Sequence, residues 1–138
     1  MPIDFTDTGY GAVFRCHGAV TGEEILERNR QLLSTEGPER WLYGVIDYAE
    51  AASVENTPPQ LRAMALQYRD LAARGKRGVV VAVVASPELE EGLAAMWRAF
   101  AEETGWRTRV IRTREEAVPW VQEEVRKAFG VDVAVPLE

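Results

Sequence analysis

Apolar residues along this chain fall into two alternating patterns, namely short continuous runs and stripes at helical spacing. The runs are rich in β-branched and aromatic residues and are bounded by glycine, proline or charged residues, which is typical of strands. The clearest run is GVVVAVVA at residues 78–85, whose valine density predicts a central strand. Further strands are expected over residues 3–7, 12–20, 41–46 and 106–111.

The segments between the runs carry apolar stripes and begin with helix-capping residues. Thr21 and Thr113 each stand three residues before a glutamate, which is the pattern of a capping box. Thr57 and Ser86 each precede a proline, which is favoured at the first position of a helix. Glycine follows each stripe, so helices are expected within residues 21–37, 57–75, 86–105 and 113–130.

The resulting order is β-β-α-β-α-β-α-β-α over a single domain of residues 1–138. Strands that alternate with helices form parallel βαβ units, whereas the glycine-containing turn at residues 8–11 joins the first two strands as an antiparallel hairpin. The pattern therefore predicts an α/β fold with one mixed, mainly parallel sheet of about four to five strands and about four helices. Residues 130–138 form a tail that either pairs as an edge strand, covers a partner or frays.

Composition and charge narrow the range of partners. Hydrophobic residues make up 46% of the 138 residues, which is enough for a full core and argues against disorder. The formal net charge of −6 argues against nucleic acid or an anionic membrane as the main partner. No apolar run is long enough to span a bilayer and the first residues do not resemble a signal peptide, so we expect a cytoplasmic protein.

The chain has one cysteine, Cys16, and one histidine, His17. A single cysteine excludes an intramolecular disulfide and a cysteine zinc site, and a single histidine excludes a multi-histidine metal site. Adjacent side chains on a strand point to opposite faces, so Cys16 and His17 are not expected to form a nucleophile–base pair. Since the sequence also lacks a glycine-rich phosphate loop, we expect no catalytic residues, no metal and no cofactor, and we do not expect an enzyme.

The stretch VIDYAEAASVENTPP, residues 45–59, is the best candidate for a recognition site. Asp47 is predicted at the end of a buried strand, followed by a loop of small residues, and α/β proteins bind ligands at such strand ends. Its carboxylate either takes part in recognition or accepts N–H bonds from its own loop. The other candidates at the same rim of the sheet are Tyr48, Ser53, Thr57, Ser86 and Arg112.

Two further groups of residues have both a structural and a functional interpretation. Met64, Met96 and Trp97 lie on helix stripes that face the predicted sheet, so they either pack in the core or line a cavity for an apolar ligand. Four arginines alternate along a predicted strand and the loop after it, namely Arg107, Arg109, Arg112 and Arg114. Arg107 and Arg109 share one strand face, and the set either forms a solvated edge that pairs with glutamates of neighbouring helices or binds an anionic partner segment. For both groups we favour the structural interpretation.

Three stretches support a family resemblance that covers residues 9–125, nearly the whole chain. They are GYGAVFRCHGAVTGEEILERNRQLL, WLYGVIDYAEA and GVVVAVVASPELEEGLAAMWRAFAEETGWRTRVIRTREEAVPWV. Together they resemble the SpoIIAA-like family, which is related in fold to the STAS domains of anti-sigma factor antagonists. The resemblance implies a small cytosolic αβ sandwich without known catalytic residues, and a role as an interaction module.

Some STAS relatives are switched by phosphorylation of a serine after the strand that corresponds to the one before Asp47. Their motif reads roughly Asp-Ser-x-Gly, and this sequence has neither an Asp-Ser pair nor a glycine there. Ser53 and Thr57 are the nearest hydroxyls, but Thr57 is already explained as a helix N-cap. Glu50 and Glu55 would also repel an added phosphate. Only the module role therefore carries over.

The sequence thus supports two hypotheses of function. In the first, the protein is a non-enzymatic interaction module that binds a protein partner, or itself as a homo-oligomer, through an exposed sheet edge or the segment after Asp47. In the second, it is a small-molecule binder or a degenerate enzyme, with a small apolar or anionic ligand in a pocket at the strand C-termini near Asp47, Tyr48, Ser86 and Arg112.

Overall fold

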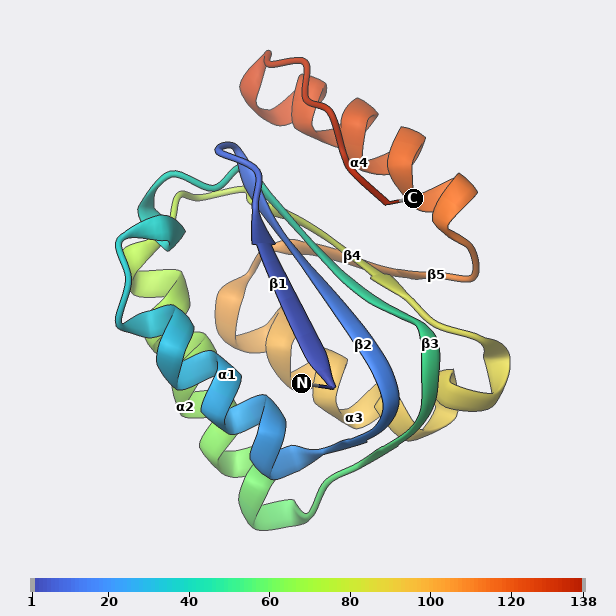
Figure 1. Ribbon diagram of the computed structural model, residues 1–138. Helices are drawn as coiled ribbons and strands as arrows, with labels where there is room; N and C mark the ends of the chain where they lie inside the picture. Colours follow the sequence, from blue (N-terminus) through green and yellow to red (C-terminus); the bar gives the residue numbers. More distant parts are fainter. Residues whose placement is uncertain (1, 138) are drawn as a thin grey trace.

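The computed structural model describes residues 2–137, and its centre is one five-stranded sheet (Figure 1). The strands lie in the order β1-β2-β3-β4-β5, and β1 and β2 are antiparallel while the other neighbours are parallel. The predicted mixed sheet with a hairpin strand at one edge is confirmed. The five strands are Ile3–Asp7, Gly11–Thr21, Tyr43–Glu55, Val80–Val84 and Arg107–Ile111.

Helices cover both faces of this sheet. Helices α1, α2 and α3 lie on one face and α4 lies on the other, so the molecule has three layers (Figure 1). The predicted α/β class and number of helices are confirmed. The helices are α1 (Gly22–Leu33), α2 (Pro58–Arg74), α3 (Pro87–Thr104) and α4 (Arg114–Phe129), with a short 3-10 turn at Gly37–Glu39.

The helices begin where the capping residues predicted. The side chains of Thr21, Thr57 and Thr113 each accept a hydrogen bond from a backbone N–H in the first turn of the following helix. Such caps satisfy donors that have no partner within the helix and stabilise a helix by about 1 kcal/mol. Ser86 is also an N-cap residue, but its side chain makes no capping hydrogen bond.

Strand β3 differs from the prediction. A strand that ends at Asp47 and gives way to a loop was expected, but β3 continues without interruption to Glu55. The reason is tertiary, because β2 also continues and pairs with β3, with two register shifts, as far as Thr21 and Glu55. In contrast, β4 pairs with β3 only as far as Asp47 and Val84. The segment after Asp47 is therefore a two-stranded ribbon and not a loop.

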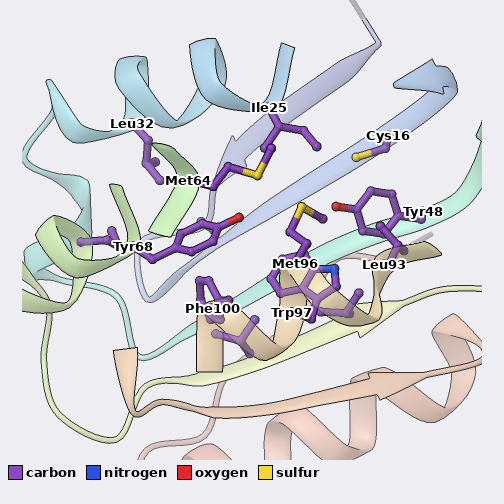
Figure 2. Close-up of a cluster of buried hydrophobic side chains, with 14 of the residues drawn as sticks. Cys16, Ile25, Leu32, Tyr48, Met64, Tyr68, Leu93, Met96, Trp97 and Phe100 are labelled. Carbon is purple, nitrogen blue, oxygen red and sulfur yellow. The ribbon is translucent and has the colours of Figure 1, made fainter. Parts of the chain in front are cut away.

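Two apolar clusters hold the layers together. On the side of α1, α2 and α3, residues such as Met64, Met96 and Trp97 pack against the sheet (Figure 2). On the side of α4, Val121 and Val125 pack against the opposite face. All five residues of β4 are buried because both clusters contact this strand.

The C-terminal tail packs against its own chain. Its residues form no strand up to residue 137, and the tail runs back beside α4 (Figure 1). Alternate side chains, Val133, Val135 and Leu137, are buried in the cluster on the α4 side. The tail carbonyls of Ala134 and Pro136 accept hydrogen bonds from the side chains of Tyr43 and Arg15, respectively.

Candidate functional site

Asp47 lies at the level where β4 ends, and its carboxylate is almost completely buried at 1% exposure. One carboxylate oxygen accepts a hydrogen bond of 2.9 Å from the backbone N–H of Ala49. The other oxygen accepts a bond of 2.6 Å from Nε of Arg114, the first residue of α4. Both oxygens are therefore engaged, and one of them serves the local turn-like role that was expected.

A chain of ionisable side chains continues from this pair across the sheet. Arg114 also bonds to Glu50 at 3.3 Å, and the same Glu50 oxygen lies 3.4 Å from Nδ1 of His17. Nε2 of His17 lies 2.8 Å from a carboxylate oxygen of Asp4. The hydrogen bond to Asp47 raises the pKa of Arg114, so this guanidinium stays charged. We call Asp4, His17, Glu50 and Arg114 the charged patch.

The remaining predicted site residues lie in different environments. Tyr48 points to the opposite face from Asp47 and is buried at 3% exposure, so it does not reach the surface. Ser86 and Arg112 follow Val84 and Ile111, which are level with Asp47 across the sheet. Ser53 lies further along, within β3, and the Thr57 hydroxyl caps α2. The structure therefore brings Asp47, Ser86 and Arg112 to one rim.

Arg114 is the residue of this site that the sequence-based interpretation did not select. The signal was present, because Thr113 was recognised as a helix cap and Arg114 is the first residue after it. The ends of neighbouring parallel strands meet at one edge, so the start of the helix after β5 lies close to the rim that Asp47 occupies. Only the strand order, which the sequence does not specify, shows that the two residues pair.

The segment of β3 beyond Asp47 has an unpaired side. In this segment Glu50, Ala51 and residues 53–55 pair with β2 on one side, but no strand of the described chain pairs with the segment on the other, because β4 ends at Val84. Ala49, Glu50, Ala52 and Glu55 are exposed along this segment. We call residues 49–55 the free edge of β3. An unpaired strand edge presents backbone donors and acceptors that another chain can use.

The structure places the adjacent residues Cys16 and His17 in different environments. Cys16 is buried in the apolar cluster on the side of α1, α2 and α3, whereas His17 belongs to the charged patch. Burial, together with the nearby carboxylates of Asp47 and Asp4, raises the pKa of the Cys16 thiol to about 12, so the nucleophilic thiolate is disfavoured. In the described part of the chain, no group of three or more His, Cys, Asp or Glu side chains is placed to hold a metal ion.

Among residues 2–137, no helix is both long enough and apolar enough to cross a membrane.

The sequence matches no protein-family model, and no curated protein is similar to it in sequence. Solved structures are nevertheless similar in fold. One is the anti-sigma factor antagonist SpoIIAA in its unphosphorylated form, with a TM-score of 0.51, 14% identity, and coverage of 86% of this chain and 96% of that chain. Another is an anti-sigma factor antagonist from Mycobacterium paratuberculosis, with a TM-score of 0.55, 14% identity, and coverage of 86% and 92%. This chain therefore has the SpoIIAA/STAS-like fold that the sequence resemblance implied.

Proposed function

We propose that this protein is a non-enzymatic regulatory module that binds a protein partner through the free edge of β3. The observation that carries the proposal is the extension of β3 beyond β4, which leaves residues 49–55 unpaired on one side. An extended partner segment adds to such an edge by main-chain hydrogen bonds, and side chains beside the edge supply specificity. The similarity in fold to anti-sigma factor antagonists supports the regulatory role by analogy.

The surroundings of the free edge suit recognition. Ala49 and Ala52 are small and exposed, so a partner backbone can approach the strand closely. The charged patch lies at the start of the edge, where Asp47 fixes Arg114 and also accepts the N–H of Ala49. Fixed charges of this kind set the register and orientation of a partner more than they add affinity.

The alternative of a small ligand bound at the strand ends has less support. Both oxygens of Asp47 are already engaged, and Tyr48 points away from this rim. Ser86 and Arg112 lie at the rim, and neither is joined to Asp47 by a hydrogen bond or an ion pair. A buried polar group that is satisfied by its own protein gains little from a ligand.

The proposal is tested by placing a charge on the free edge. Ala52→Lys adds a long cation where a partner strand would lie, and Ala73→Lys adds the same cation at an exposed position of α2. A stoichiometric partner is first isolated with the unmodified protein and then titrated with both variants. We expect Ala52→Lys to weaken the complex by about tenfold or more and Ala73→Lys to leave it unchanged.

Two results would count against the proposal. One is the failure of any stoichiometric partner to bind the unmodified protein, with self-association checked by sedimentation in the same experiments. The other is equal binding by the two lysine variants, which would place the interface elsewhere. Circular dichroism of both variants confirms that the fold is retained before binding is compared.

A further inference from the structure

An apolar cavity of about 90 Å³ lies between the sheet and the layer of α1, α2 and α3. Aliphatic and aromatic side chains from both layers line it, including Met96, Trp97 and Phe100 of α3 (Figure 2). Protein interiors are normally packed with few voids larger than a water molecule. A cavity of this size in a chain of 138 residues therefore requires an explanation.

Small residues on the sheet create the cavity. Ala12 of β2 and Gly44 of β3 are directly paired, and both line the cavity. A Cβ added at Gly44 would meet only ordinary contacts, at 3.9 Å from the carbonyl oxygen of Ala12 and from Val81. Gly44 does not have a positive φ, so backbone geometry does not require glycine there. A glycine within a sheet often marks a position where a ligand approaches the backbone closely.

Two indole N–H groups in the cavity wall lack a well-formed hydrogen bond. The Nε1 atoms of Trp41 and Trp97 are both buried without a hydrogen bond of normal geometry, the phenol of Tyr48 lies beside the Trp97 indole, and both tryptophan side chains line the cavity. Indole N–H is a donor only, so each of these groups requires an acceptor. Buried polar groups are almost always satisfied, and an orphan often marks a missing water or ligand.

The cavity wall also offers hydroxyl groups but disfavours negative charge. The phenol oxygens of Tyr48 and Tyr68 point toward one another across the space beside Met96 (Figure 2). Burial raises the pKa of both phenols, so they stay protonated. The charged side chain in the lining is Arg28, whose guanidinium lies 4.7 Å from the ring centroid of Phe5.

We propose that this cavity binds a small, uncharged, mainly apolar molecule that carries one hydrogen-bond acceptor. The acceptor receives the indole N–H of Trp97, and the apolar part of the molecule lies over Gly44 and Ala12. No residue of the free edge of β3 lines this cavity, so the proposal is tested independently of partner binding.

Two cyclic probes of equal size test the proposal. Cyclopentanone carries one carbonyl acceptor, whereas methylenecyclopentane has the same shape and no strong acceptor. Each probe is titrated into ¹⁵N-labelled protein, and the indole N–H resonances of Trp41 and Trp97 are followed by NMR. We expect cyclopentanone to shift the Trp97 resonance in the direction of a new hydrogen bond, and methylenecyclopentane to bind without that shift.

Two variants make the test specific. Trp97→Phe removes the donor and keeps an aromatic ring. It should therefore weaken the binding of cyclopentanone by about three- to tenfold, and it should change the affinity for methylenecyclopentane by less than about twofold. Gly44→Val fills the cavity and should weaken the binding of both probes by about tenfold or more. Circular dichroism checks that both variants fold.

Three results would overturn the proposal. The first is that neither probe moves any cavity resonance up to its solubility limit. The second is that Gly44→Val leaves both affinities unchanged, which would place binding outside the cavity. The third is a long-lived water that gives a nuclear Overhauser effect to the Trp97 indole and that cyclopentanone does not displace, because the cavity would then be a hydration site only.

Discussion

At the scale of single residues, the buried carboxylate of Asp47 is the main electrostatic feature of this rim. Removing a charge from water costs free energy unless the charge is paired and hydrogen-bonded. Asp47 is paired with Arg114 and also accepts a hydrogen bond from the backbone N–H of Ala49. The sequence-based interpretation foresaw the local bond to the backbone, because Asp commonly bonds two residues ahead. It did not foresee Arg114, because that contact depends on the order of strands in the sheet.

The pair makes a prediction about stability. Arg114→Gln removes the positive partner and leaves the Asp47 carboxylate with the N–H of Ala49 alone. Arg114 is partly exposed, so water replaces some of the lost interaction, and we expect a loss of about 2 kcal/mol in the free energy of unfolding. Urea denaturation followed by tryptophan fluorescence measures the change.

Arg112→Gln is the matched control for this prediction. Arg112 lies two residues away and is exposed, so its substitution should change the free energy of unfolding by no more than about 0.5 kcal/mol. Equal effects of the two substitutions would show that Asp47 does not depend on Arg114.

At the scale of elements, most of the chain was predictable and the length of β3 was not. Helix starts are set by local chemistry at residues such as Thr21 and Thr57, and the structure has the caps that these residues predicted. The end of a strand depends instead on its neighbours. Small residues after Asp47 indicated a loop, but pairing with the long strand β2 keeps them extended as far as Glu55.

The C-terminal tail was equally undetermined by local pattern. Its alternating valines suit an edge strand, but the tail instead lies over β2 and β3 beside α4. Its carbonyls bond to side chains of the sheet, and its alternate residues fill the cluster on that face. Such packing is decided by which part of the sheet α4 leaves uncovered, and the sequence alone does not show this.

The tail should therefore contribute to stability as part of the core. Val135→Ala removes buried methyl groups, and we expect a loss of about 2 kcal/mol in the free energy of unfolding, measured by urea denaturation. Ala134→Ser changes the exposed neighbour and should have almost no effect. A neutral result for Val135→Ala would mean that the tail is not held on the sheet in solution.

At the scale of the whole molecule, the alternation of strands and helices was sufficient to predict one mixed, mainly parallel sheet with about four helices. The class and the element order followed from periodicity, because a strand as apolar as β4 requires cover on both faces. For the two functional features that we propose, the pattern offered only open alternatives, namely an exposed edge or the segment after Asp47, and a cavity beside Met96 and Trp97. The free edge of β3 and the cavity over Gly44 both arise where packing is incomplete, and a hydrophobic pattern indicates only where packing occurs.

Hydrogen exchange should show this difference within one strand. The backbone amides of residues 43–47 lie between two paired strands, whereas residues 49–55 pair with β2 alone. The amides of β4 and of residues 43–47 should therefore open only in global unfolding, and those of residues 49–55 should exchange about a hundredfold faster through local opening. Amide exchange followed residue by residue by NMR measures both sets in one sample. Equal protection along the whole of β3 would show that the segment beyond Asp47 is already covered, and would remove the basis for partner binding at this edge.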